Sequence, residues 1–251
     1  MKNNKYWEDR IILKDKLLEK DIKKIDKKLL KAFKDARKDI LNELKIIYTD
    51  IENTEYAKYR IDSLLASVNI ALDNLYNQNE ELLTKAFIEL YRKFNEEASI
   101  DLGVSFNVIN ENLIREVISN NWSGLSFSER IWEHRRKLAL TLKEELTKGL
   151  IRGDSLQDIS RVMADKLNNS YQNALRLVRT ESCFIMNEAT INNYKDNDIK
   201  AYQFMAFLDK KTSKQCREMD NKIISIEDYK IGKNCPPLHP NCRSAIAPII
   251  D

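Results

Sequence analysis

All four prolines of this 251-residue chain lie within its last sixteen residues. Proline lacks a backbone N–H donor and disrupts the interior of a helix, so the long stretch before Pro236 is free of the strongest helix breaker. The distribution therefore predicts a mainly α protein, in which long helices come first and a less regular region comes last. The four residues are Pro236, Pro237, Pro240 and Pro248.

Apolar periodicity supports the helical interpretation. From Ile22 to Ile47 apolar residues recur every three or four positions, as on one face of an amphipathic helix. The intervals between these apolar residues are nearer an eleven-residue than a seven-residue repeat, which favours packing within the protein. Helix pairing between chains is the alternative. A second tract, about 55–98, is expected to break near 77–79. Shorter helices are expected near 113–118, from 126 to Gly149 or Gly153, over 155–167 with Ser155 as cap, and over 174–189.

The pattern changes after residue 198. Ile199 to Leu208 is rich in aromatic and branched residues and short enough for a strand. Residues 223–226 and 245–250 are its candidate partners in a small antiparallel sheet. Because 121–124 reads as a connector, we predict a long-helix region over residues 1–121 and an α+β domain over residues 122–251.

Composition limits the classes of partner. Charged residues make up 32% of the chain and hydrophobic residues 43%, which fits a folded, helix-rich protein. The longest apolar runs are too short to span a bilayer, so we expect no membrane partner. The net charge of +3 predicts no strong nucleic-acid binding by itself. Residues 1–48 carry 15 Lys or Arg against 9 Asp or Glu, which indicates either a solvated helix face or an anionic partner.

Cysteine and histidine residues gather near the C-terminus in the order Cys-x18-Cys-x3-His-x2-Cys. Three thiolates and one imidazole are the donor set of a closed, tetrahedral structural zinc site, so we predict Zn²⁺ as a cofactor. Two alternatives remain: a proline-rich turn with reduced, buried cysteines, or a disulfide between Cys216 and Cys235. The predicted ligands are Cys216, Cys235, His239 and Cys242.

Several short motifs occur in a fixed order around these ligands. Arg-Thr-Glu stands in a predicted helix, an aromatic strand follows, and then come Asp-Lys-Lys-Thr-Ser-Lys-Gln-Cys and Cys-Pro-Pro-Leu-His-Pro-Asn-Cys-Arg. This ordered combination resembles the phage Mu F-like head morphogenesis family over roughly Trp122 to Pro248. The motif residues, beside the predicted ligands, are Arg179, Thr180, Glu181, Asp209, Thr212, Pro236, Pro237 and Arg243.

The resemblance implies a function in virion assembly. Such proteins are minor head, or minor capsid, proteins of tailed bacteriophages and prophages, held at or near the portal inside the procapsid. The resemblance therefore implies a virion protein that is in the host cytoplasm during assembly and contacts the portal. The scaffold or major capsid protein, and packaged or ejected DNA, are further partners that it implies. We expect no enzymatic activity and place partner binding in the long helices before Trp122.

Two departures from the family pattern bear on the site. Many relatives have Gly in the turn where this chain has Asp220-Asn221, and Asn tolerates a positive φ there. Many relatives end Cys-Arg-Cys where this chain has Cys242-Arg243-Ser244, so a possible alternative ligand is missing. Cys216 is therefore more necessary as the fourth member of the ligand set.

Two other functions remain as alternatives. In the first, the protein is stabilised by zinc and binds DNA phosphates without sequence preference, through basic residues beside the predicted zinc ligands. In the second, Glu181, Asp209 and His239 converge on a metal in a hydrolase. With two histidines, no nucleophile motif and no phosphate-binding glycine loop, the hydrolase is the weaker alternative. The candidate DNA contacts are Lys210, Lys211, Lys214 and Arg217.

Overall fold

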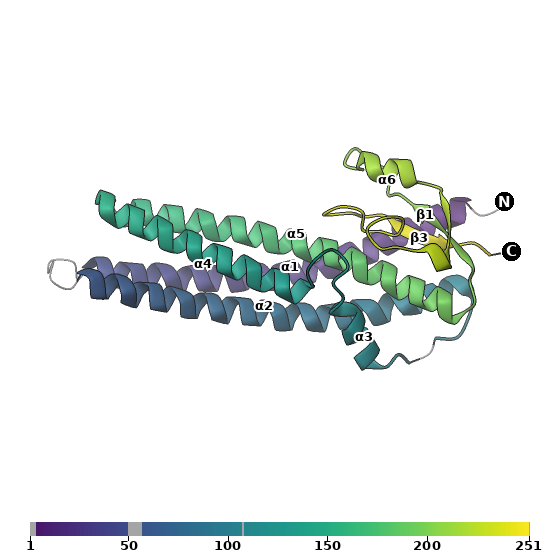
Figure 1. Cartoon of the computed structure of the whole chain (residues 1–251), viewed down its shortest axis with the longest axis horizontal. Helices are drawn as coiled ribbons and strands as arrows, with labels where there is room; N and C mark the ends of the chain where they lie inside the picture. Colours follow the sequence, from purple (N-terminus) through teal and green to yellow (C-terminus); the bar gives the residue numbers. More distant parts are fainter. Residues whose placement is uncertain (1–3, 50–56, 107, 251) are drawn as a thin grey trace. The chain divides into compact units, whose positions relative to one another are not determined.

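The structure, a computed structural model, describes residues 4–49, 57–106 and 108–250 (Figure 1). It is mainly α with a small antiparallel sheet near the C-terminus, which confirms the predicted fold class. The elements are α1 (Asn4–Thr49), α2 (Ala57–Leu102), α3 (Glu111–Ile118), α4 (Phe127–Arg152), α5 (Leu156–Asp196), β1 (Ala201–Met205), α6 (Lys214–Met219), β2 (Ile223–Ser225), the 3₁₀ turn η2 (Ile226–Asp228) and β3 (Ala245–Pro248).

Two helices are longer than the sequence pattern predicted. The break expected near residues 77–79 is absent from α2, where Asn79 is buried together with Leu75 and Leu83. The two helices expected over 155–189 form the single helix α5. In both places packing outweighs the weak helix propensity of asparagine. Helix α4 runs through Gly149 and ends at Arg152, before Gly153 with a φ of 73°.

The described chain divides into two compact units, each built from separate segments. The first unit contains residues 1–25, 83–127 and 176–251, and the second contains residues 26–82 and 128–175. The expected boundary at residue 121 falls inside the first unit, so the regions 1–121 and 122–251 do not coincide with these units.

The second unit is helical and has an aromatic centre. The ring of Phe33 makes edge contacts with Tyr76 and Tyr171, at centroid distances of 6.3 and 5.8 Å. The Tyr76 hydroxyl lies 2.7 Å from Ser170 Oγ, so its polar end is satisfied inside the core. Ser155 accepts a hydrogen bond from the backbone N–H of Asp158, as the predicted helix cap requires.

The first unit contains the sheet, whose strand order is β2-β1-β3. Both pairings are antiparallel, and Tyr202 of β1 lies opposite Ile224 on one side and Pro248 on the other. The three strands lie within the predicted segments and confirm the predicted sheet. The turn before β2 places Asn221 at a φ of 64°, the left-handed conformation expected where relatives have glycine.

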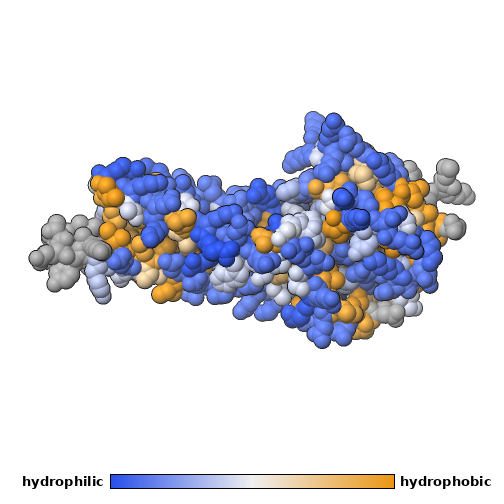
Figure 2. Space-filling model, in the orientation of Figure 1, coloured by the Kyte–Doolittle hydropathy of each residue, from blue (hydrophilic) through white to orange (hydrophobic). Residues whose placement is uncertain are grey.

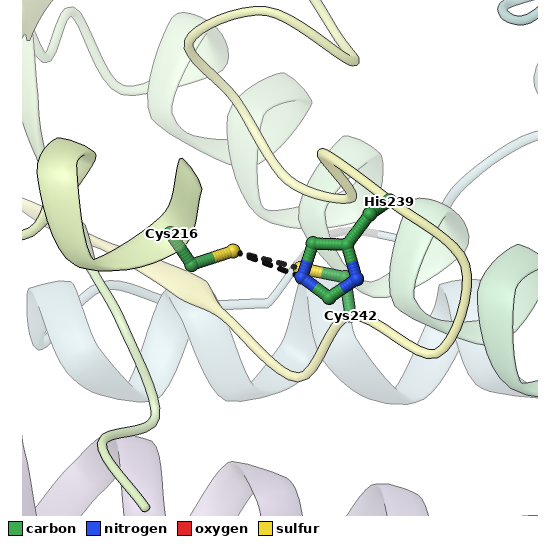
Figure 3. Close-up of side chains that lie close together, drawn as sticks. All are labelled: Cys216, His239 and Cys242. Carbon is green, nitrogen blue, oxygen red and sulfur yellow. Dashed lines mark hydrogen bonds between the residues drawn. The ribbon is translucent and has the colours of Figure 1, made fainter. Parts of the chain in front are cut away.

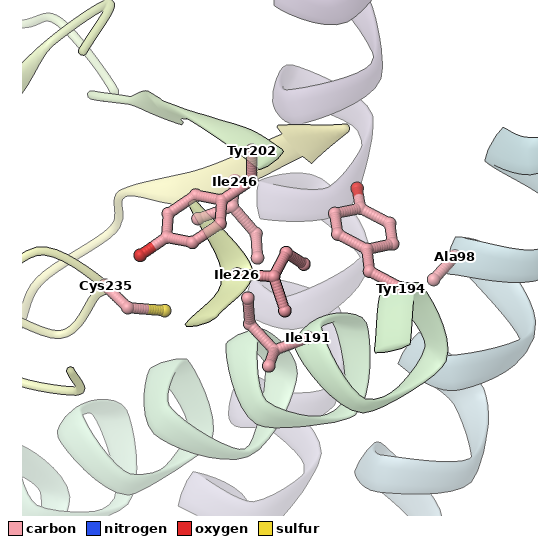
Figure 4. Packing of buried hydrophobic residues seen from close by; sticks show 7 residues of the cluster. All are labelled: Ala98, Ile191, Tyr194, Tyr202, Ile226, Cys235 and Ile246. Atoms are coloured by element: carbon pink, nitrogen blue, oxygen red, sulfur yellow. The ribbon is translucent and has the colours of Figure 1, made fainter. Parts of the chain in front are cut away.

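One apolar cluster fixes the sheet on the helices of the first unit (Figure 4). Tyr202 and Ile246 come from the sheet, whereas Ile191 and Tyr194 come from the end of α5. All four side chains are almost completely buried. The other members of the cluster are Ala98, Ile226 and Cys235.

A buried ion-pair group connects the first turns of α1 with the last turns of α2 in the first unit. Asp101 accepts a hydrogen bond from Arg10 at 2.6 Å and forms an ion pair with Lys14 at 2.5 Å, and its side chain has no exposed surface. Arg10 also pairs with Glu97 at 2.9 Å. Because both cations are largely buried, this group specifies how the two helix ends pack.

The predicted apolar stripe of α1 is buried within the chain from Ile22 to Leu44. On the face drawn in Figure 2, hydrophilic residues cover most of the surface and hydrophobic residues form separate small patches. Among the described residues, no helix combines the length and apolar character that a membrane crossing needs.

Candidate metal site

Cys216 is positioned by a side-chain turn and a helix cap. Thr212 donates to the Phe207 carbonyl at 2.7 Å and accepts from the Asp209 backbone N–H at 2.7 Å. Ser213 then caps α6, since its Oγ accepts from the backbone N–H of Cys216 at 3.2 Å. The family motif residues Asp209 and Thr212 thus shape the turn that carries Cys216.

His239 and Cys242 lie in the loop before β3, within one turn. The Cys242 N–H donates to the His239 carbonyl at 3.2 Å. Asn241 has a φ of 59°, and its N–H donates to Thr180 Oγ1 at 3.1 Å. The motif residue Thr180 on α5 therefore holds the loop that carries both ligands.

The imidazole of His239 is oriented for ligation. Its Nδ1 lies 2.9 Å from the Pro240 carbonyl oxygen. Since a carbonyl only accepts, Nδ1 carries the proton of the neutral ring, and the Nε2 lone pair points to the side of Cys216, where it accepts from the thiol. Nε2 lies 3.2 Å from Cys216 Sγ, as Figure 3 shows. This is the arrangement in which metal-binding histidines donate their second nitrogen to an outer acceptor.

The three donor atoms of Cys216, His239 and Cys242 all lie within 4.8 Å of one another. The two sulfurs are 3.7 Å apart. Two thiolates on one tetrahedral zinc would lie about 3.8 Å apart, given Zn–S bonds of about 2.3 Å. The distance between the two sulfurs therefore fits one metal ion bound by both of them.

The thiols are neutral in the absence of a metal. A hydrogen bond with Cys242, together with burial, raises the pKa of Cys216. A hydrogen bond with Cys183, followed by burial, raises the pKa of Cys242 to about 11. Metal binding at these sulfurs must therefore displace protons.

Cys235 lies outside this group, which corrects the predicted set of four ligands. Its side chain is fully buried beside Tyr202 and Ile246, where burial raises the pKa of the thiol. All four cysteines are free thiols, and Cys216 and Cys235 belong to different clusters, so the disulfide alternative is not supported. Pro236 and Pro237, which follow Cys235, are buried as well.

Cys183, to which the sequence pattern gave no role, packs against the site. It forms a buried cluster with Phe204, Cys216 and Cys242. Its Sγ lies 3.6 Å from the Ser244 carbonyl and 3.5 Å from the Asn187 amide nitrogen, which donates to it. The sequence pattern did not single out Cys183 because every residue from 181 to 190 of α5 is buried. No single face of this part of the helix is marked as the one that packs against the site.

Two motif arginines stand beside the ligands. Arg243 pairs with Asp209 at 2.9 Å and Asp15 at 3.4 Å, and its guanidinium lies 3.8 Å from the centre of the Phe207 ring. A backbone hydrogen bond from Lys211, and then the charge of Arg243, lowers the pKa of Asp209. Burial raises the pKa of Asp15 despite the opposing effect of Arg243.

Arg179 and Glu181 have separate partners. Arg179 lies 4.0 Å from Glu19 of α1. Glu181, almost fully buried, accepts from Trp122 Nε1 at 3.1 Å. Trp122 in turn stacks on Phe184 at a centroid distance of 5.3 Å. Glu181 is absent from the lining of the cavity beside the ligands, whereas Asp209 and His239 are part of it.

That cavity, of about 580 Å³, adjoins the candidate ligands in the first unit. Cys216 and His239 form part of its wall, and charged side chains of both signs form much of the rest. The charged lining residues are Asp15, Glu19, Arg179, Asp209, Lys211 and Arg243.

The basic residues proposed for DNA contact are exposed at α6 and the turn before it. Lys214 is 90% exposed and lies 3.7 Å from Glu218. Arg217 donates to the carbonyls of Asp209 and Thr212 at 2.5 and 3.3 Å, so it also supports the turn. Lys210 and Lys211 are exposed on that turn.

A family model described as phage Mu protein F like protein matches residues 140–247. The match includes the candidate metal ligands, both motif arginines and the turn that carries Cys216. This segment belongs to the phage Mu F-like family. The resemblance proposed from the motifs is thereby confirmed, and the family supports a bacteriophage head protein, hence a virion protein, in general terms.

One curated relative is an NAD(+)–arginine ADP-ribosyltransferase EFV from Enterococcus faecalis. It is 23% identical over 218 residues, which cover 81% of this chain and 45% of the relative. This chain thus spans about half the length of that protein. No solved structure matches the chain.

Proposed function

We propose that this chain is a minor head protein that acts in bacteriophage head morphogenesis in association with the portal. One observation carries the proposal. The Mu F-like match spans the complete module, and inside it the motif residues Arg179, Thr180, Asp209 and Arg243 contact the turns around the ligands or line the adjoining cavity. The scaffold and the major capsid protein are further candidate partners in the same assembly.

The test is association with the portal protein of the phage or prophage that encodes this chain. We expect the two proteins to co-purify after co-expression and to occur together in assembled heads. Exposed apolar residues on the first turns of α1, Ile12 and Leu13, are candidate contacts, being 41% and 40% exposed. Ile12→Glu with Leu13→Glu should reduce portal recovery, whereas Leu140→Glu on α4, 59% exposed, should not. Absence of the wild-type chain from both pull-downs and heads would refute the proposal.

We further propose that Cys216, His239 and Cys242 bind a structural Zn²⁺ ion. The donor types, the sulfur spacing and the oriented imidazole support this assignment. A bound ion would connect α6 to the loop before β3, which few apolar residues hold together. Metal analysis of the purified protein should give one zinc per chain, with loss in Cys216→Ala and Cys242→Ala and retention in Cys235→Ala. Equal zinc contents in all four proteins would contradict the assignment.

We propose that the chain is not an enzyme. More than half of the transferase relative lies outside the matched region. The match therefore covers too little of that protein to carry the activity in its name over to this chain. The purified chain should consume no NAD⁺ in the presence of an arginine-containing acceptor. Turnover above that of a heat-denatured control would overturn this assignment.

DNA binding is the second candidate function, and the exposed cations Lys210, Lys211 and Lys214 favour it. Contacts with phosphates release counterions, so retention on DNA should fall steeply with added salt and depend little on sequence. Replacing the three lysines with Gln should flatten that salt dependence. A wild-type chain that fails to bind DNA even at low salt would exclude this function, and ejection with DNA would then have to rest on protein contacts alone.

A further inference from the structure

The trio of Cys216, His239 and Cys242 supplies three ligands, whereas a tetrahedral ion has four coordination positions. Within residues 4–49, 57–106 and 108–250, no fourth Cys, His, Asp or Glu joins the group. The question is therefore what occupies the remaining position.

The nearby candidates for a fourth protein ligand are held by other partners. Cys183 lies against the Ser244 carbonyl and accepts from Asn187, and although it also hydrogen-bonds Cys242, it does not line the cavity. Cys235 is buried in the cluster around Tyr202. Asp209 pairs with Arg243 through one carboxylate oxygen and accepts from the Lys211 N–H through the other.

The trio has one side that faces open space. Cys216 and His239 line the 580 Å³ cavity, whereas Cys242 and Cys183 do not. A cavity of this size admits a small ligand, because single-molecule binding sites begin at roughly 300 Å³. An ion bound between the three ligands would therefore reach the cavity through the side formed by Cys216 and His239.

The cavity wall offers a donor in need of an acceptor. Arg179 lines the cavity, and its buried Nε has no hydrogen-bond partner among the described residues. The guanidinium forms an ion pair with Glu19 at 4.0 Å, through Nη2 and not through Nε. A buried donor left unpaired costs free energy, which an anionic oxygen would recover. A divalent ion with two thiolates and a neutral imidazole has no net charge, so it would not repel such an anion.

We propose that the metal site is open, and that a small oxyanion, a carboxylate or phosphate group, occupies its fourth position while accepting a hydrogen bond from Arg179. The proposal rests on metal binding by the trio as proposed above. It makes the cavity a ligand-binding site and Arg179 a specificity-determining residue in it.

Full-length protein loaded with Co²⁺ gives a direct test, because the visible absorption of Co²⁺ reports its coordination geometry and its thiolate ligands. Addition of acetate or inorganic phosphate should shift the ligand-field bands saturably. A response to only one of the two probes would support the proposal and identify the class of oxyanion. Unchanged bands with both probes, in a protein that binds Co²⁺ through Cys216 and Cys242, would overturn the open site and leave metal binding intact. Failure to bind Co²⁺ would instead refute the metal site itself.

Two variants separate the open site from a closed one. Cys183→Ala should keep the sulfur-to-cobalt charge-transfer intensity of the wild type, with Cys235→Ala as the matched buried control. A loss confined to Cys183→Ala would make Cys183 the fourth ligand and overturn the proposal. Arg179→Gln should weaken the oxyanion titration about tenfold without changing Co²⁺ affinity, whereas Arg176→Gln, an exposed residue one turn earlier on α5, should have no effect. Equal oxyanion affinities in the two arginine variants would remove Arg179 from the site.

Discussion

The imidazole of His239 is held by the carbonyl of the next residue, Pro240, and its other ring nitrogen lies 3.2 Å from Cys216 Sγ. Short spacing placed His239 beside Cys242 because the turn that joins them is a local structure. The same loop misled the prediction for Cys235, because closeness in sequence does not fix the direction of a side chain. Cys235 points into the cluster of Tyr202 and Ile246 instead.

The raised pKa values of the two thiols make metal binding depend on pH. Cys242 has a pKa of about 11, and that of Cys216 is raised as well, so both sulfurs are protonated near neutral pH in the metal-free protein. Each must lose its proton to bind, so affinity should rise with pH. Because two thiol protons are released for each ion bound, the apparent metal affinity should increase about 100-fold per pH unit in this range. Competition with a chromophoric chelator between pH 6.5 and 7.5 measures it, and a pH-independent affinity would exclude ligation by both thiols.

Zinc should also stabilise the fold, because a ligand that binds only the folded state shifts the unfolding equilibrium. At free zinc 100 times its dissociation constant the gain is about 2.7 kcal/mol. The thermal unfolding temperature should be higher with zinc than with a chelator in the wild type and in Cys235→Ala. In Cys216→Ala the two temperatures should be the same. Because each variant is compared with itself, loss of packing at either cysteine does not affect the result. A zinc-dependent shift that persists in Cys216→Ala would argue for another set of ligands.

Glu188 is a buried carboxyl whose ionised form is unfavourable. Burial raises its pKa above 4.5, the usual value for a glutamate, although the charge of Lys195 and a hydrogen bond from Tyr229 oppose the change. The folded state therefore holds the proton more tightly, and this stabilising contribution is present below about pH 4.5 and is lost as pH rises through the folded pKa. Glu188→Gln should match the wild type near pH 4 and be more stable at pH 8. Denaturant unfolding at both pH values tests this, with exposed Glu218→Gln as control, and a destabilised variant at pH 8 would contradict it.

At the scale of elements, the sequence identified helices and strands well but misplaced some of their ends. The segments 199–208, 223–226 and 245–250 contain the three strands, since short branched and aromatic runs bounded by turns carry a local signal. The continuity of α2 and α5 was missed because it depends on packing far along the chain. Asn79 is buried, and Ser170 of α5 binds the Tyr76 hydroxyl of α2.

The junction between the start of α1 and the end of α2 rests on Asp101. Asp101→Ala would leave Lys14 buried without a counter-ion and Arg10 with Glu97 alone, at a cost of roughly 3–5 kcal/mol. Chemical denaturation should show this loss, and hydrogen exchange should accelerate in the first turns of α1. The control is Asp198→Asn, which removes the charge of a carboxylate that is 94% exposed and lies 3.8 Å from Lys200, at a positive φ that Asn tolerates. Equal stability of the two variants would show that the buried group does not hold these helix ends together.

At the scale of the whole molecule, the first unit cannot be read as one continuous stretch of sequence, because it combines residues 1–25, 83–127 and 176–251. Local patterns predict elements, but the joining of distant segments depends on tertiary contacts such as those of Asp15 and Glu19 with Arg243 and Arg179. Ala98 of α2 likewise belongs to the core cluster of the sheet. The family match to residues 140–247 therefore lacks side chains on which the site depends.

This organisation predicts the behaviour of a fragment containing residues 122–251. It keeps all the cysteines and His239 but loses Ala98, Asp15 and Glu19, so a buried cluster is opened and two arginines lose carboxylate partners. The fragment should unfold less cooperatively than the full chain and bind Co²⁺ more weakly, as measured by circular dichroism and metal titration. Co-expression with a separate chain of residues 1–121 should restore both properties, because that chain supplies the missing segments. A fragment that alone matches the full chain in cooperativity and metal affinity would show that residues 122–251 form an independent domain after all.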